Sequence, residues 1–138
     1  MIEFYSENDF ILNHEPELSQ WISAEIKSHN FEEGEIVYIF CDDAYLHKLN
    51  LQFLQHDTLT DIISFDTSIG NLLNGEIYIS TERVADNASD FKTTFTEELH
   101  RVIIHGILHF CGLKDKSAEE ATQMREAENK ALEKRDFI

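Results

Sequence analysis

The sequence has few cysteines, prolines and glycines, and it lacks any long apolar run. Two cysteines, Cys41 and Cys111, are too few in 138 residues for a disulfide-rich secreted scaffold. One proline and five glycines exclude the collagen-like and low-complexity classes. The first ten residues, MIEFYSENDF, lack the basic and apolar regions of a signal peptide, and no apolar run approaches the ~18 residues of a membrane span. We therefore expect a soluble cytoplasmic protein with no membrane partner.

Basic residues are also scarce, since 11 Lys and Arg against 27 Asp and Glu give a formal net charge of −16. This charge argues against broad, non-specific affinity for nucleic acid or for an anionic membrane. The excess is uneven, because residues 1–35 hold nine acids and one base, whereas six of the eleven bases lie from Lys114 onward. A local site in the C-terminal third can therefore be less negative than the chain as a whole.

Hydrophobic residues make up 42% of the chain, and no linker, repeat or biased tract interrupts it, so we expect one domain over residues 1–138. Apolar, β-branched segments predict strands at 2–5, 35–41, 62–65 and 76–80, the last two suited to pairing as a hairpin. Periodic apolar segments predict five helices, at 17–27, from 43 through Phe53, at 81–91, at 96–111 and from 118 to about 135. The predicted fold class is α+β, with a small mixed four-stranded sheet flanked by about five helices.

Capping residues mark where three of these helices begin. The acids at positions 42 and 43 offer an N-cap to the second helix. Thr94 with Glu97, and Ser117 with Glu120, have the form of a capping box before the fourth and fifth helices.

The helix at 96–111 carries the candidate chemistry. It is apolar on almost every face, which is typical of a helix buried in the centre of a small domain. His105 and His109 are four residues apart, so they lie about 40° apart on one helix face and can chelate one metal ion. A single buried histidine is more often a hydrogen-bonded core residue, but the spacing of the pair favours a metal site.

A third ligand follows the end of this helix. Gly112 is a suitable residue to end the helix, and Asp115 stands three residues further, giving the pattern H-x-x-x-H-x-x-G-x-x-D. Three protein donors leave a fourth position open for water, which is typical of a catalytic zinc site. An alternative is that Asp115 is a surface residue that competes with Ser117 to cap the last helix. Cys111 points to another face, and we assign it to the core.

Gly106 directly follows the first histidine, where zinc peptidases of the H-E-x-x-H type carry their general base. Its presence disfavours a peptidase. A glycine inside a helix costs about 1 kcal/mol relative to alanine. We therefore expect either close packing against that turn or a substrate that passes over it.

The segment HGILHFCGLKD resembles the H-G-x-L-H-x-x-G-Y-D-H signature of the YbeY family, which comprises metal-dependent endoribonucleases and rRNA maturation factors. Upstream, NLQFLQHDTLTDIISFD is similar to the family pattern N-x-x-[YF]-R-x-x-D-x-x-T-D-V-L-S-F, and GEIYIS to G-[DE]-I-x-I-S. The resemblance implies that His105 and His109 are zinc ligands, with Asp115 in the place of a third histidine. It also implies the family's small sheet flanked by helices, with the metal at one end.

A further departure concerns charge. The family's arginine, which the resemblance assigns to the phosphate, is replaced by Leu54, and Lys114 is either a substitute cation or a solvated surface residue. Additional candidates for the substrate cleft are Asp57, Thr60, Asp61 and Ser64, which keep the family pattern, together with Gly106 and Lys114. Asp57 and Asp61 have the alternative role of capping the turn before a strand.

Three functions remain open at this point. The first is a metal-dependent endoribonuclease that acts on single-stranded RNA in rRNA maturation and ribosome quality control, with one Zn²⁺ or another divalent transition metal. The second is a ribosome-associated binding factor with little nuclease activity, and the third is a metzincin-like zinc peptidase. The expected partners are an rRNA precursor and a ribosomal subunit or a ribosome-associated protein. Basic residues on one wall of a groove beside His105 would favour the first.

Overall fold

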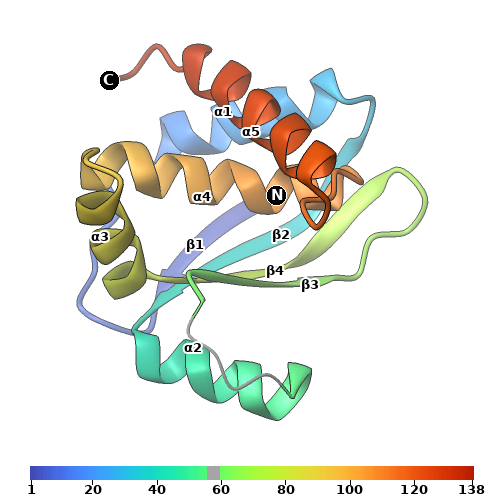
Figure 1. The fold of residues 1–138 in the computed structure, drawn as a ribbon. Coiled ribbons are helices and arrows are strands. Elements are labelled where there is room, and N and C mark those ends of the chain that lie inside the picture. The colour runs from blue at the N-terminus through green and yellow to red at the C-terminus, as the bar shows by residue number, and fades with distance from the viewer. Residues whose placement is uncertain (56–59) are drawn as a thin grey trace.

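The computed structural model describes residues 1–55 and 60–138, and these form one mixed sheet with helices on both faces (Figure 1). The strands are β1 (Ile2–Ser6), β2 (Glu32–Cys41), β3 (Ile62–Asp66) and β4 (Leu72–Ser80), in the spatial order β1-β2-β4-β3. β1, β2 and β4 run parallel, whereas β3 is antiparallel to β4. The α+β class, the four-stranded sheet and the predicted hairpin are therefore confirmed.

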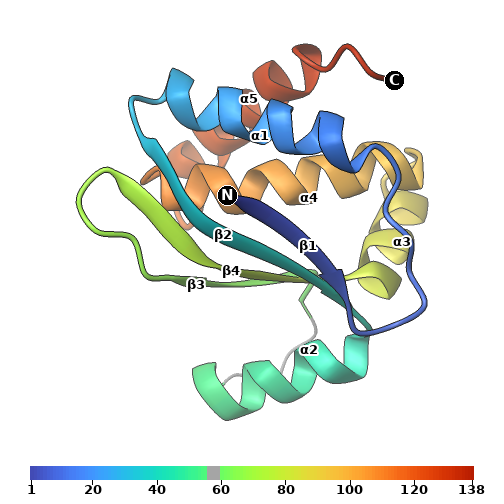
Figure 2. The same cartoon turned by 180° about the vertical axis from the view of Figure 1, so that it is seen from behind.

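The five predicted helices are present as α1 (Glu15–Ser28), α2 (Asp43–Leu49), α3 (Thr81–Asp90), α4 (Phe95–Phe110) and α5 (Ala118–Glu133). Figures 1 and 2 show α1, α4 and α5 on one side of the sheet and α2 on the opposite side. α1 and α4 both contact the strands, and α5 packs on α4. Within the described residues, no helix is long and apolar enough to span a membrane.

The second helix is shorter than predicted. α2 ends at Leu49 and is followed by a wider π-helical turn, η1 (Asn50–Leu54), which ends where Gln55 takes a left-handed conformation. Phe53 therefore lies outside the α-helix, and its ring packs edge-on against Phe65 of β3 at a centroid distance of 5.7 Å. The apolar periodicity did not distinguish the two kinds of turn.

The caps agree with the sequence except at one position. The Asp42 side chain accepts from the Tyr45 N–H, and Ser117 with Glu120 forms a complete capping box. Thr94 accepts from the Glu97 N–H, but the Glu97 carboxylate accepts from Arg135 at 2.7 Å. The second bond of that predicted box is thus replaced by an ion pair with the C-terminal segment.

α4 lies in the centre of the core, as predicted from its apolar faces. The buried residues of this helix include Leu99, Val102, Ile103, Ile104, Ile107 and Leu108. Gly106 faces the sheet, and a Cβ added there would lie 3.1–3.2 Å from methyl groups of Ile62 and Ile77. Close packing, rather than passage of a substrate, therefore accounts for this glycine.

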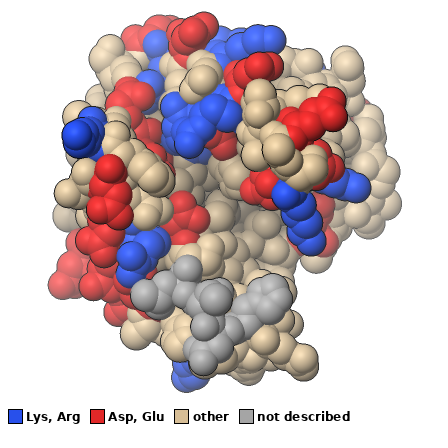
Figure 3. Space-filling model, viewed as in Figure 1, with Lys and Arg blue, Asp and Glu red and all other residues tan. Residues whose placement is uncertain are grey.

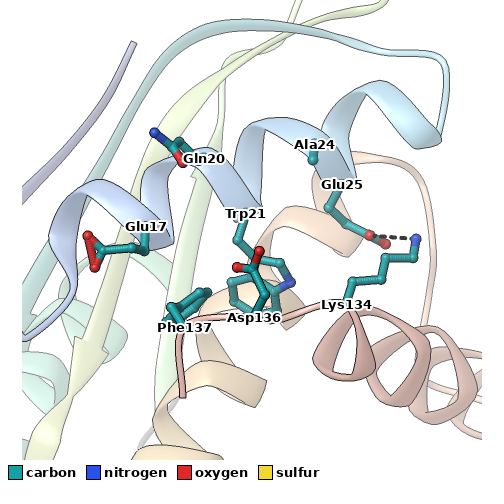
Figure 4. Close-up of a pocket in the computed structure, with 8 residues that line it drawn as sticks. All are labelled: Glu17, Gln20, Trp21, Ala24, Glu25, Lys134, Asp136 and Phe137. Carbon is teal, nitrogen blue, oxygen red and sulfur yellow. Dashed lines mark hydrogen bonds and ion pairs between the residues drawn. The ribbon is translucent and has the colours of Figure 1, made fainter.

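The segment after α5 fastens that helix to α1 (Figure 4). The Trp21 Nε1–H donates to the Ala131 carbonyl at 2.8 Å, and the Phe137 ring meets the Trp21 ring edge-on at a centroid distance of 6.3 Å. Lys134 pairs with the buried Glu25 at 3.2 Å. These contacts hold α5 against α1. α5 also packs on α4, where it contributes to the site described next.

Candidate metal centre

The chain reverses direction at the C-terminal end of α4. Gly112 has a φ of 97°, and its N–H donates to the His109 carbonyl while the Leu113 N–H donates to the Leu108 carbonyl. This pair of bonds is the Schellman motif, which requires a residue that tolerates a positive φ. The reversal carries Asp115 back to the helix face that bears His109.

Three side-chain donors meet at this turn. The Asp115 Oδ2 lies 3.4 Å from His105 Nε2 and 3.3 Å from His109 Nε2. The two imidazole rings are 4.4 Å apart between centroids and almost perpendicular. Each residue offers one ligand atom, and the three atoms all lie within 4.8 Å of one another. The structure therefore brings the three predicted ligands together.

Both imidazoles are held by their other nitrogen. His109 Nδ1 lies 2.9 Å from the Leu113 carbonyl oxygen, which can only accept, so Nδ1 carries the proton. His105 Nδ1 lies 2.6 Å from Glu128 Oε2 on α5. Each ring thus points its Nε2 lone pair towards Asp115. An acceptor behind each histidine is the usual support of a metal-binding imidazole.

The donor set fits one divalent metal ion. Ligands bound at about 2.0–2.1 Å at the corners of a tetrahedron lie about 3.3–3.4 Å apart, which is the spacing of each Nε2 from the Asp115 oxygen. Two lone pairs and a carboxylate oxygen converge, and a cation between them would neutralise their repulsion. Ser117 caps α5, so Asp115 does not have the alternative capping role.

Glu128 is charged and largely buried beneath His105. Burial opposes ionisation of Glu128, but hydrogen bonds from His105 and Arg101 outweigh it and lower the pKa of the carboxyl. Burial likewise opposes protonation of His105, yet the hydrogen bond and charge of Glu128, with Asp115 and Asp61 nearby, raise the pKa of His105. His105 therefore sits in a negative environment that favours a cation at its free nitrogen.

A hollow of about 290 Å³ adjoins the cluster, between the end of α3, the start of β3 and the middle of α4 and of α5. Figure 3 shows this face hollowed near its centre, with Lys and Arg side chains along the rim among many acidic ones. The described residues that line the hollow include His105, Asp115, Asp61, Glu98, Glu128, Arg101 and Arg125. Two arginines, one on α4 and one on α5, thus lie in the hollow beside His105 together with four acids.

Two carboxyls in this hollow have raised pKa values. Burial is the main cause at Asp61, where the charge of His105 and a 3.4 Å hydrogen bond from Asn87 oppose it. Burial also raises the pKa of Glu98, and the charge of Asp61 adds to it. The wall of the hollow is therefore partly dehydrated.

The remaining cleft candidates occupy different places. Thr60 is half-buried and its hydroxyl donates to the Ile62 carbonyl at 3.3 Å, while Ser64, two residues beyond Ile62 on β3, lies on the same sheet face as Ile62. Lys114 is exposed and is absent from the described residues that line the hollow. Asp57 lies outside the described residues. Leu54 lies in η1, after the helix that covers the opposite face of the sheet.

Sequence reasoning missed Glu128, Arg101 and Arg125. A signal for Glu128 is present, because it shares helical spacing with Met124, Ala131 and Leu132, the apolar stripe of α5. A carboxylate on an apolar stripe requires a buried partner. No comparable signal separates Arg101 and Arg125 from other surface cations.

Comparison with known proteins agrees with the fold and the motifs. The family model described as Endoribonuclease YbeY matches residues 3–136. A protein named Endoribonuclease YbeY from Christiangramia forsetii is 59% identical over 95% of this chain and 92% of its own length. Its namesake from Flavobacterium johnsoniae is 55% identical over 96% of this chain and 95% of its own length. The solution structure of TM1509 from Thermotoga maritima superposes with a TM-score of 0.69 at 28% identity, covering 96% of this chain and 87% of that one. The chain belongs to the endoribonuclease YbeY family.

Proposed function

We propose that the chain is a metal-dependent endoribonuclease that hydrolyses phosphodiester bonds of single-stranded RNA during rRNA maturation. We assign one Zn²⁺ to His105, His109 and Asp115. The observation that carries the assignment is the convergence of two Nε2 atoms on Asp115 Oδ2, with both Nδ1 atoms already committed to acceptors. The donor set also suits other divalent transition metals.

Three residues around that ion have different roles. A bound zinc would supply a Lewis acid for the phosphoryl oxygen and would acidify a coordinated water. Asp115 offsets one positive charge of the centre, and Glu128 holds the proton on His105 Nδ1, so that Nε2 stays a lone-pair donor. Arg101, with Nη1 and Nη2 bound to Glu128 and Asn129 at 2.9 Å, is fixed beside the site as a positive charge for an anionic substrate.

The expected partners are an rRNA precursor and a ribosomal subunit or a ribosome-associated protein, in the cytoplasm. The net charge of −16 supports a requirement for such a partner. A polyanion gains little from long-range attraction to this surface, so a basic partner would have to bring the RNA to the groove. A binding factor with little nuclease activity is the second candidate, and this charge is the observation in its favour.

The peptidase alternative has less support. The position after His105, where such enzymes carry a general base, is a glycine packed under Ile62 and Ile77. A glutamate side chain there would point into the sheet rather than into the hollow.

The test is cleavage of a single-stranded RNA and of casein by the purified, zinc-loaded protein, with and without a chelator. We expect chelator-sensitive cleavage of RNA only, and its loss in Asp115→Ala together with weaker zinc binding. RNA binding without cleavage would favour the binding factor, and cleavage of casein would favour the peptidase. An Asp115→Ala variant that retains zinc as tightly as the parent would exclude Asp115 from the ligand set.

A further inference from the structure

A second hollow, of about 180 Å³, adjoins the one beside His105, and the two share Phe91, Glu98, Arg101 and Arg125. The first leads to His105 and Asp115, whereas the second leads away to Thr93 and Glu97. The shared residues come from the end of α3, from α4 and from α5. One groove therefore runs from the candidate metal centre along the N-terminal half of α4.

Arg125 is the guanidinium in this groove with donors to spare. Its side chain is 56% exposed, and its ion pair with Glu128 is 3.7 Å long, beyond the range of a direct hydrogen bond. Arg101, in contrast, is 23% exposed and donates to Glu128 and Asn129 at 2.9 Å. Guanidinium groups bind phosphate through paired hydrogen bonds, so Arg125 is placed to bind one phosphate group.

Phe91 supplies an aromatic surface that lines the same two hollows as this cation. It is the residue that ends α3, and it is 62% exposed although it lines both hollows. Because its ring is exposed, Phe91 contributes little to the stability of the hydrophobic core. A nucleobase of any identity can stack on such a ring, and a cation with a neighbouring aromatic platform is how proteins hold single-stranded nucleic acid.

We propose that this groove binds a short single-stranded segment of the RNA, with one phosphate on Arg125 and one base on Phe91. This inference rests on the proposed function, because it supplies the path by which a strand reaches His105 and Asp115. It assigns two positioning residues, neither of which belongs to the metal cluster.

The acids of the groove limit the length of the contact. Glu98, Glu128 and Asp61 line the same surface, so a strand laid along its whole length would meet negative charge at several points. One phosphate contact beside one stacked base avoids most of that repulsion. The groove therefore selects a footprint of one or two nucleotides, and the rest of the strand lies outside it.

The test measures binding of a fluorescein-labelled ten-nucleotide single-stranded RNA of mixed sequence to the zinc-loaded protein. Anisotropy is recorded on ice over a range of KCl concentrations, and gel analysis of the same samples reports cleavage. Arg125→Gln should weaken binding about fivefold to tenfold and reduce the slope of log K against log salt by about 0.7, the value for one single-strand phosphate. Phe91→Leu should weaken binding about fivefold or more and leave the slope unchanged, while Phe91→Trp should restore it.

Lys130→Gln is the matched control. Lys130 is an exposed cation on α5 that faces α1 rather than the groove, and its loss changes the net charge by the same amount. Equal effects of Arg125→Gln and Lys130→Gln would overturn the phosphate contact, and full binding by Phe91→Leu would overturn the stacked base. If binding follows the expected pattern but the parent protein leaves the RNA intact, the groove stands and the nuclease proposal fails. If the parent cleaves and neither variant changes binding, the groove alone fails.

Discussion

Two histidines on α4, five residues apart, have opposite environments. His100 is 2% exposed, and its Nδ1 accepts a 2.8 Å hydrogen bond from Arg135, which also pairs with Glu97. The rings of Trp21 and Phe137 lie against it at centroid distances of 6.0 and 5.7 Å. Burial, together with the charge of Arg135, lowers the pKa of His100 to about 4. This imidazole is a neutral core residue.

His105 differs chiefly in the group that faces its Nδ1. A carboxylate rather than a guanidinium lies there, so Nδ1 donates and Nε2 remains open towards Asp115. The pKa of His105 is raised, because Glu128 outweighs the effect of burial. The comparison teaches that the partner behind the ring, more than burial, separates a candidate ligand histidine from a structural one.

The largest expected effect comes from removing a ligand. His109→Ala should lose most of the bound metal and more than about a hundredfold of the RNA cleavage, because two donors remain for a solvated ion. His100→Gln should keep the metal, since His100 is buried in the core and does not belong to the candidate metal cluster. Elemental analysis after gel filtration, with a cleavage assay, measures both. Equal metal contents in the two variants would show that His109 is no more a metal ligand than His100 is.

The lowered pKa of His100 predicts how the stability of the protein depends on pH. Because the folded pKa of His100, about 4, lies below the unfolded value of about 6.5, the unfolded chain binds the proton first. His100 therefore contributes stability above pH 6.5 that is lost as the pH falls towards 4. Between pH 7 and 4.5 the parent should lose roughly 2–3 kcal/mol more than His100→Gln.

Urea denaturation of the two proteins at each pH measures that difference. All other ionisable groups are common to the two proteins, so their contributions cancel. Parallel pH curves would show that folding does not lower the pKa of His100.

The smallest of the three effects concerns the support behind His105. Glu128→Gln keeps an acceptor for Nδ1 but removes the charge, so zinc affinity should fall about tenfold. Glu126→Gln, an exposed acid on the same helix, is the matched control and should change affinity less than about twofold. Competition with a chromophoric chelator gives both constants. A zinc affinity unchanged by Glu128→Gln would show that the charge of Glu128 does not contribute to zinc binding.

Local signals explain which parts of this architecture could be predicted from sequence. The capping box at Ser117, the apolar faces of α4, and the histidine pair followed by Gly112 are all encoded within a few residues, and each appears where it was predicted. The acceptor for His105 comes from a residue 23 positions later. α5 holds several other acids, and only the packing of α5 on α4 selects Glu128.

The boundaries that were wrong also depend on distant partners. β2 and β4 extend beyond their predicted starts because Glu32 and Glu33 pair with Leu72 and Leu73 across a bulge. Glu97 bonds Arg135 rather than completing its own cap. In both cases a contact made in the folded chain outweighed a local pattern.

The dependence of His105 on α5 has a consequence for the order of events during synthesis. Both histidines and Asp115 leave the ribosome before Glu128 does, so a nascent chain can present the three ligands while His105 still lacks its buried acceptor. Arg125, proposed to hold the phosphate, is translated with the same late helix. On the proposed function, a half-made chain would have a loosely oriented candidate metal centre and an unfinished groove, and it would acquire the capacity to cut RNA only when α5 docks.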